Sequence, residues 1–206
     1  MTTTLNKIEM MESLKTLRSE LELLKKPDSE QKAIYYKTGP GDYAEHDQFI
    51  GVNVPNLRKV TKRYQKLLPF SSLQELLYSP INEERLLALL ILVIHYQKGD
   101  TELKQTIFQF YLTHINQINN WNLVDASAHW IVGAHLLDKD KTLLFTLTES
   151  TNLWEKRIAI VATWYFIRNN HFDCTLKLAE KLLFDNHDLI HKAVMKWTYP
   201  PHNRLL

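Results

Sequence analysis

Apolar residues recur every three or four positions along most of this chain, between charged and polar residues. Over residues 5–26 the apolar positions follow this spacing, and Pro27 ends the pattern. Such spacing predicts an amphipathic helix. After Pro55 the same period returns in segment after segment, and no window shows the alternation that is typical of a half-buried strand. The pattern therefore predicts an all-α protein.

The expected helices after Pro55 are separated by short breaks. They cover residues 56–67, 72–79, 83–98, 101–117, 121–137, 140–149, 153–170, 172–184 and 187–197. Two of them contain stretches that are apolar on nearly every side, LLALLILVIHY and IAIVATWYFI, which is typical of helices packed between other helices. Residues 38–55 hold three of the five glycines and two prolines, so we expect an ordered loop there.

The predicted helices also form a repeat. Asn82, Asn120, Asn152 and Asn186 each precede a helix, where asparagine is a favoured N-cap, and they are 38, 32 and 34 residues apart. This is the period of stacked helix pairs of the HEAT, armadillo or TPR type, and the TPR signature is absent. We therefore predict an α-solenoid of HEAT-like repeats that forms a single domain over residues 1–206. We expect residues 1–4 to be flexible and residues 198–206 to form an irregular tail.

Composition narrows the class of protein. The 206 residues are 45% hydrophobic and 23% charged, which is enough for a sizeable core and excludes a disordered or low-complexity chain. The single cysteine, Cys174, excludes a disulfide scaffold and a cysteine-rich zinc site. The sequence shows no signal-peptide pattern and no run of 18 apolar residues, so we expect a cytoplasmic protein without a membrane segment. The nine histidines show no H-E-x-x-H motif; His187 and His191 lie four residues apart near Asp188 and could bind a metal, but a capped helix start is the favoured interpretation.

Asp125 is the sharpest candidate for chemistry, because it is the only formal charge between Ile115 and Leu137. Trp121 lies four residues before it and His129 four residues after it, so the three share one helix face. A lone carboxylate beside an indole is suited to stabilising a positive charge that develops during a reaction. The alternative is structural: Asp125 pairs with Arg157 or Arg85 and joins adjacent repeats. Counting five residues on from each repeated asparagine gives Leu87, Asp125, Arg157 and His191, and it predicts a common surface that would hold the last three.

Two sets of basic residues are further candidates. Arg157 opens a helix on one stripe with Trp154 and Trp164, where it could hold a phosphate, orient Asp125 or simply pair with a neighbouring carboxylate. Residues 58–66, RKVTKRYQK, hold five positive charges and no negative one. Such a stripe can follow a phosphate backbone, although a solvated helix face has the same pattern. The net charge of +2 is too small to decide between these readings.

Through these residues the sequence resembles the AlkD-type DNA alkylation repair enzymes, which are glycosylases built from HEAT-like repeats. The resemblance covers roughly residues 30–194. Its stretches are KTGPGDYAEHDQFIGVNVPNLRKV (37–60), NEERLLALLILV (82–93), NNWNLVDASAHWIVG (119–133), TNLWEKRIAIVATWYFIR (151–168) and FDNHDLIHKAV (184–194). It implies a monofunctional glycosylase that excises cationic alkylpurines, chiefly N3- and N7-alkylated, from double-stranded DNA. It further implies hydrolysis of the N-glycosidic bond without a cofactor or metal, without base flipping, and by a monomer associated with the nucleoid.

The resemblance also implies roles for single residues. Asp125 would stabilise an oxocarbenium-like sugar and position water, Trp121 would pack against that sugar, and Arg157 would hold the adjacent phosphate and orient Asp125. The residues that we expect to bind DNA are Asn53, Arg58, Lys59, Lys62, Arg63 and Lys192.

The C-terminal segment departs from the family pattern. Met195 and Lys196 occupy the positions of a Gly-Trp pair, and Trp197 comes one residue late. A slip of one residue turns a helical side chain by about 100°. Trp197 is therefore a lesion-contact candidate in an altered register, and we expect a short or truncated C-terminal repeat. The alternatives to a glycosylase are a DNA-binding repeat protein without catalysis and a HEAT-like scaffold that binds a protein.

Overall fold

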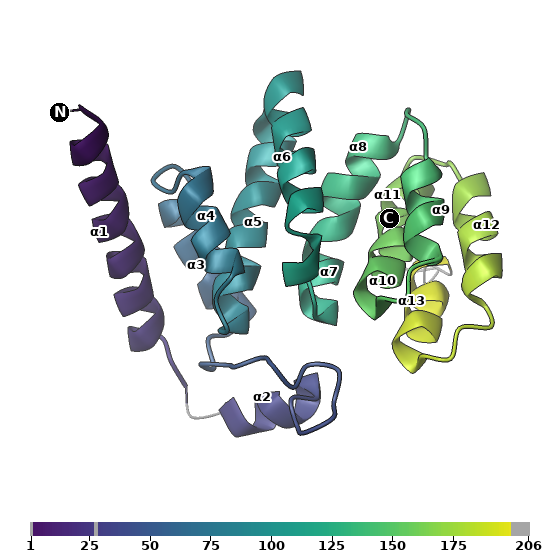
Figure 1. The fold of residues 1–206 in the computed structure, drawn as a ribbon, viewed down its shortest axis with the longest axis horizontal. Helices are drawn as coiled ribbons and strands as arrows, with labels where there is room; N and C mark the ends of the chain where they lie inside the picture. The colour runs from purple at the N-terminus through teal and green to yellow at the C-terminus, as the bar shows by residue number, and fades with distance from the viewer. Residues whose placement is uncertain (1, 27–28, 199–206) are drawn as a thin grey trace. The chain divides into compact units, whose positions relative to one another are not determined.

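The computed structural model describes residues 2–26 and 29–198, with the side chains of residues 12–26, 31 and 34–196. Helices make up most of this chain, and the only extended pairing among the described residues is an isolated parallel bridge between Gln48 and Ile81 (Figure 1). The predicted all-α solenoid of helical repeats is confirmed. The chain forms two compact units, Met1–His95 and Tyr96–Leu206. The prediction of a single domain over the whole chain stays a prediction.

The first unit contains five helices among its described residues. They are α1 (Thr2–Leu23), α2 (Ser29–Tyr36), α3 (Val54–Tyr64), α4 (Phe70–Leu77) and α5 (Asn82–Lys98), of which α5 runs on into the second unit. Four of the five agree with the sequence pattern. The exception is α2, which the sequence did not predict: it has only eight residues, and its Ile34 and Tyr35 are exposed, so it lacks a regular apolar stripe.

Helix α1 is fixed to the rest of this unit by a buried apolar stripe and by one arginine. Leu14, Leu17 and Leu21 are buried, as the spacing predicted. Arg18 on the same helix donates to Glu75 of α4 over 2.8 Å and to Glu84 of α5 over 3.0 Å. The stripe and the two ion pairs thus connect α1 with α4 and α5.

The loop over residues 38–55 is ordered by buried carboxylates. Asp47 accepts hydrogen bonds from Asn82, over 2.7 Å, and from Arg85. Glu83 accepts from the backbone N–H groups of Ile50 and Gly51 over 3.2 and 3.0 Å. These bonds satisfy backbone donors that the loop would otherwise leave unpaired inside the protein. The predicted ordered loop is therefore confirmed.

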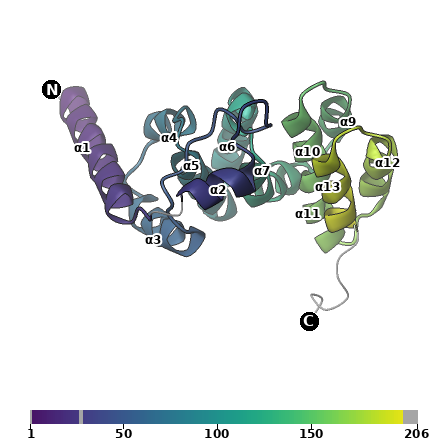
Figure 2. The same cartoon turned by 90° about the horizontal axis from the view of Figure 1, so that it is seen from below.

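The second unit continues the helical repeat. Its elements are α6 (Thr101–Thr113), the 3₁₀ turn η1 (Ile115–Gln117), α7 (Trp121–Ala128), the π-helical turn η2 (His129–Gly133), α8 (Ala134–Leu136), α9 (Thr142–Thr148), α10 (Leu153–Ala162), α11 (Trp164–Arg168), α12 (Asp173–Leu182) and α13 (Asp188–Thr198). Helix α10 packs against α7, α9 and α13 (Figure 2). Its residues 158–162 are fully buried, as expected for a helix that is apolar on all sides. The irregular tail expected from residue 198 lies outside the described residues, apart from Thr198, which ends α13.

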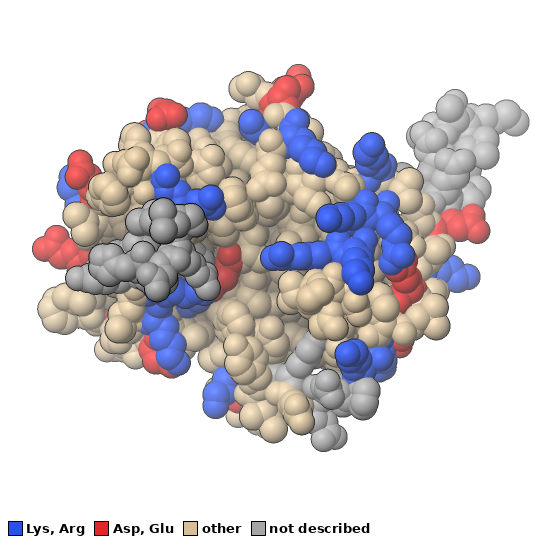
Figure 3. All heavy atoms as spheres, turned by 180° about the vertical axis from the view of Figure 1, so that it is seen from behind, with Lys and Arg blue, Asp and Glu red and all other residues tan. Residues whose placement is uncertain are grey.

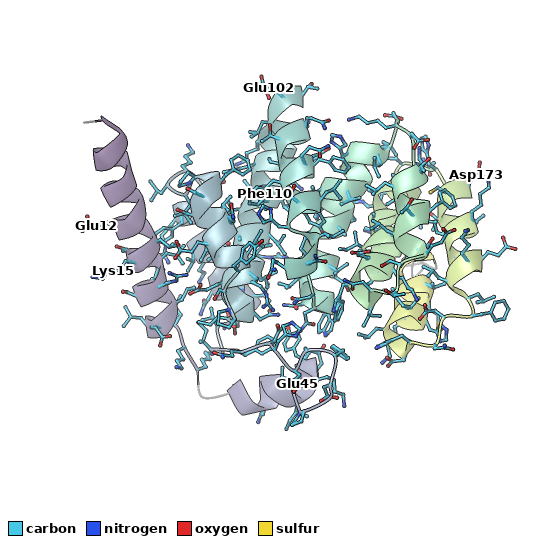
Figure 4. The ribbon with its side chains drawn as sticks, in the orientation of Figure 1. Glu12, Lys15, Glu45, Glu102, Phe110 and Asp173 are labelled. Carbon is cyan, nitrogen blue, oxygen red and sulfur yellow. The ribbon has the colours of Figure 1, made fainter. Side chains whose placement is uncertain are left out.

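The helix starts in this unit use several kinds of polar group. Asn152 caps α10 as predicted, with its Oδ1 accepting from the Trp154 N–H over 2.9 Å. Asn120 occupies the cap position of α7 without a side-chain cap bond. The prediction that Asn186 precedes its helix directly is wrong by one residue, because α13 begins at Asp188. Figure 4 shows Glu102 and Asp173 at the starts of α6 and α12, where a negative charge complements the helix dipole.

Candidate active site

The site is built around the carboxylate of Asp125 on α7. Arg157 of α10 donates to one oxygen of this carboxylate from two nitrogens, with Nε 3.1 Å and Nη2 2.8 Å from Oδ1. Because α10 packs against α7, this ion pair joins two neighbouring helices. The side chain of Asp125 nevertheless keeps 12% of its surface exposed, so its carboxylate is recessed but reachable.

Arg157 is fixed more firmly than Asp125. Its side chain is only 5% exposed, and its Nη1 donates to the backbone carbonyl oxygen of Leu189 on α13 over 2.6 Å. The guanidinium is therefore engaged by α7 and α13 at once. The sequence left several partners open for Arg157. In the structure its guanidinium contacts Asp125.

A second cation, Lys196 of α13, lies on the opposite oxygen of the same carboxylate. Its Nζ is 3.1 Å from Oδ2 of Asp125, and its side chain is 57% exposed. Arg157, Asp125 and Lys196 together carry a net charge of +1. Sequence reasoning noted Lys196 only as a departure from a family pattern. No spacing could have found this contact, since the two residues are 71 positions apart.

Trp121 completes the set that the sequence predicted in this region. It is the first residue of α7, one turn before Asp125, and its side chain is partly exposed. Residues four apart on a helix share a face. By this spacing Trp121 is on the same face of α7 as Asp125, while Asp125 itself contacts Arg157 of α10.

Three comparisons relate this chain to known proteins. The family model described as DNA alkylation repair enzyme matches residues 17–197. The chain belongs to this family of DNA alkylation repair enzymes. The comparison with curated proteins and the comparison with solved structures each found no match. The matched range includes Trp121, Asp125, Arg157 and Lys196.

In this alkylation repair enzyme, His129 lies one turn after Asp125 and is buried. The pKa of His129 is lowered from 6.5 to about 4, chiefly by burial and also by the charge of Arg168, while Asp125 acts in the opposite direction. His129 is thus neutral near pH 7 and adds no third cation beside Asp125. The sequence predicted that His129 shares a helix face with Asp125, but it gave no sign that the His129 side chain is buried.

The helix that bears Asp125 changes its form directly after it. Residues His129–Gly133 make a π-helical turn, and such turns occur frequently at functional sites. Gly133 lies so close to α10 that a Cβ atom there would come within 2.1 Å of the Ala162 carbonyl oxygen. The close approach that glycine allows keeps η2 against the helix that supplies Arg157.

The basic stripe lies on α3 of the first unit, and its side chains are exposed. Figure 3 shows lysine and arginine side chains gathered over α3. Arg63 pairs with Glu20, so part of its charge is compensated. Asn53 caps α3, with its Oδ1 accepting from the Asn56 N–H over 2.9 Å. The structure thus confirms an exposed basic helix face and gives Asn53 a structural role that its sequence position did not reveal.

Other predicted positions do not join the site. Leu87, at the corresponding count in the first unit, is fully buried. Arg85, the alternative partner for Asp125, pairs with Asp47. Lys192 is exposed on α13 and pairs with Asp188 over 2.7 Å. The side chain of Trp197 lies outside the described residues, so its contact with a lesion stays a prediction.

The described residues offer no group of three or more His, Cys, Asp or Glu side chains that could hold a metal ion. Nor does any helix within residues 2–26 and 29–198 have the length and apolar character needed to cross a membrane.

Proposed function

We propose that this alkylation repair enzyme is a DNA glycosylase that excises cationic N3- and N7-alkylated purines from double-stranded DNA. The observation that carries the proposal is the recessed carboxylate of Asp125, which Arg157 holds through a single oxygen while its other oxygen faces an exposed side chain. The enzyme would act in the cytoplasm on chromosomal DNA, without a cofactor.

The chemistry of the substrate explains why one carboxylate suffices. An alkylated purine carries a positive charge, which is neutralised when the base leaves, so no general acid is needed to protonate it. The N-glycosidic bond breaks and the positive charge moves to the deoxyribose. A carboxylate in a partly desolvated site stabilises such a developing cation at short range. Asp125 would do this and would orient the attacking water.

The neighbours of Asp125 have distinct roles in this proposal. Arg157 is a positioning residue, because it fixes the rotation of the carboxylate and is itself fixed by the Leu189 carbonyl group. Trp121 would pack its ring against the sugar. Lys196 is exposed and lies on Oδ2, so this oxygen is on the accessible side of the carboxylate and would face the substrate.

Exposed basic residues would hold the DNA. Arg58, Lys59, Lys62 and Arg63 form the face of α3, and Lys192 is exposed on α13. Contacts between such side chains and phosphates give affinity without sequence preference. Holding the duplex by its backbone is compatible with a lesion that stays stacked, because no pocket for a flipped base is then needed.

One observation favours a different function, that of a scaffold without catalysis. The Asp125–Arg157 ion pair joins α7 to α10 and would stabilise a repeat protein whatever its activity. In that case the pair serves folding, and the protein surface binds DNA or a protein passively. The two functions differ in one measurable respect, which is the effect of Asp125 on base release.

The test is release of 7-methylguanine and 3-methyladenine from methylated duplex DNA by the wild type and by Asp125→Asn. The asparagine keeps the shape and one acceptor for Arg157 but removes the charge. We expect base release by the wild type, a loss of at least about a hundredfold in Asp125→Asn, and unchanged DNA binding. Asp173→Asn is the matched control, since Asp173 is an exposed carboxylate at the start of α12 (Figure 4). No release by a folded wild-type protein would refute the glycosylase and leave the scaffold.

A further inference from the structure

Lys196 places a primary amine beside the carboxylate that, in the proposed function, faces the sugar. Its Nζ lies 3.1 Å from Asp125 Oδ2, within reach of direct proton transfer. Its side chain is 57% exposed. Arg157, the other cation on Asp125, is buried and donates both to Asp125 and to the Leu189 carbonyl oxygen. The two cations are therefore not equivalent: Arg157 is buried, whereas Lys196 is exposed at the surface beside Oδ2.

We propose that Lys196 gives this enzyme a second activity, cleavage of DNA at abasic sites through a Schiff base. The inference rests on the proposed function, because an abasic sugar is the product that base removal leaves beside Asp125. In its ring-opened form this sugar has an aldehyde at C1′. A lysine amine is the side chain that forms Schiff bases with carbonyl groups, and the arginine on Asp125 cannot do so.

The first half of the reaction forms the covalent bond. Asp125 Oδ2 accepts a proton from the Lys196 ammonium, and the neutral amine attacks the C1′ aldehyde to give a carbinolamine. The protonated carboxyl group then returns its proton to the hydroxyl of this adduct, which leaves as water. The products are an iminium ion between C1′ and Nζ and the regenerated carboxylate of Asp125.

The second half breaks the strand. The Asp125 carboxylate takes a proton from C2′, and the electrons of that C–H bond form an enamine. The enamine electrons then make the C2′–C3′ double bond and expel the 3′ phosphate, which leaves with the electron pair of the C3′–O bond. Water hydrolyses the remaining iminium ion to an unsaturated aldehyde and frees Lys196. Protons and electrons balance without an oxidant or a reductant.

The experiment uses the full-length protein and duplex DNA with one abasic site made in advance. Sodium cyanoborohydride in the reaction reduces the iminium ion and leaves a stable protein–DNA adduct, which is read on a denaturing gel. Parallel reactions without it measure strand cleavage. The variants are Lys196→Arg, which keeps the positive charge beside Asp125 but cannot form the imine, and Lys177→Arg, an exposed lysine of α12.

We expect an adduct and strand cleavage with the wild type and with Lys177→Arg, and a loss of at least about tenfold in both with Lys196→Arg. Peptide mapping of the wild-type adduct should place the DNA on Lys196, a result that does not depend on any variant folding. An adduct on another amine, equal trapping by Lys196→Arg, or no adduct with the wild type would each overturn the proposal.

The outcome is separable from that of the proposed function, because the abasic duplex needs no base removal. Base release from methylated DNA without an adduct on abasic DNA would overturn the lyase and leave the glycosylase. An adduct on Lys196 without base release would support the lyase and refute the glycosylase.

Discussion

Arg157 donates from Nε and Nη2 to the same oxygen of Asp125, Oδ1, and leaves Oδ2 to Lys196. A carboxylate held in this way cannot rotate freely, yet one of its oxygens stays accessible from the surface. Arg157 gains its own rigidity from the backbone of Leu189. Three helices, α7, α10 and α13, thus determine the direction of one C–O bond.

The first prediction concerns Arg157→Lys. A lysine keeps the charge, but its single ammonium cannot contact both Asp125 and the Leu189 carbonyl group in the planar geometry of a guanidinium. We expect base release to slow by about ten- to a hundredfold, with little change in the Kd for undamaged duplex DNA. Single-turnover kinetics and a binding titration on the same preparations would measure the two effects separately.

Arg168→Lys is the matched control for this variant. Arg168 lies near the end of α11, with its guanidinium 5.3 Å from the Trp130 ring, and it is exposed. It should retain wild-type base release. If Arg157→Lys were as fast as this control, orientation of Asp125 by Arg157 would be ruled out.

The second prediction separates the structural role of Asp125 from its chemical role. Arg157 is buried, so Asp125→Ala leaves a buried charge without its partner, and we expect a loss of about 3 kcal/mol in the free energy of unfolding. Asp125→Asn keeps an oxygen that accepts from Arg157 and should lose clearly less. Both variants lack the carboxylate and should be equally inactive. Urea denaturation, read by circular dichroism, gives the stabilities.

The informative result is the combination of the two measurements. A variant that is stable and inactive shows that the carboxylate is needed for more than joining α7 to α10. If activity fell only in proportion to stability across the two variants, the ion pair would be structural and the scaffold function would follow.

The third prediction concerns the basic face of α3. If Lys62 contacts a phosphate, Lys62→Ala should weaken duplex binding and lower the slope of log K against log salt concentration by about one. Arg63→Ala should lower this slope less, because its guanidinium already pairs with Glu20. Fluorescence anisotropy at several salt concentrations measures both. Lys15→Ala on α1 is the control (Figure 4), and a salt slope that none of the variants changes would exclude α3 from the DNA interface.

The helix pattern was predictable because burial imposes a period on the sequence. Leu14, Leu17 and Leu21 are buried where the spacing places them, and α10 is as apolar on all sides as its sequence indicates. The breaks inside the long predicted helices were not predictable. The π turn at His129–Gly133 depends on how closely Gly133 approaches α10, and the break at Thr163 depends on its hydroxyl donating to the Ile160 carbonyl oxygen over 2.7 Å.

In the candidate site, too, some features follow from the sequence pattern and others depend on packing. Asp125 was conspicuous because it is a lone charge in an apolar segment, and the repeat period brought Arg157 to it. At the corresponding position the first unit has the buried Leu87. Lys196 had no local signal, since its contact with Asp125 arises only when α13 packs against α10. Periodicity predicts which helices are neighbours, whereas the identity of the contacting side chains depends on packing.

The fourth prediction is a loss of stability on mild acidification. The pKa values of His129 and His135 are both lowered to about 4, chiefly by burial, with Lys139 adding to the effect at His135. In the unfolded chain both histidines titrate near 6.5, so between about pH 6.5 and pH 4 the unfolded state binds protons that the folded state does not. Stability is therefore complete above about pH 6.5 and falls as the pH drops toward 4.

The size of this effect can be bounded for His129. It is 7% exposed, and a displacement of its pKa from 6.5 to about 4 corresponds to roughly 3 kcal/mol at the acid end of the window. The groups that act on it are Arg168 and Lys196, which oppose its protonation, and Asp125, which favours it.

Urea denaturation between about pH 7 and pH 5 isolates the histidines, because ordinary carboxylates titrate below this range. His129→Gln should flatten the dependence of stability on pH over this interval. A wild-type stability that is constant over this interval would mean that His129 binds its proton in the folded state as readily as in the unfolded chain.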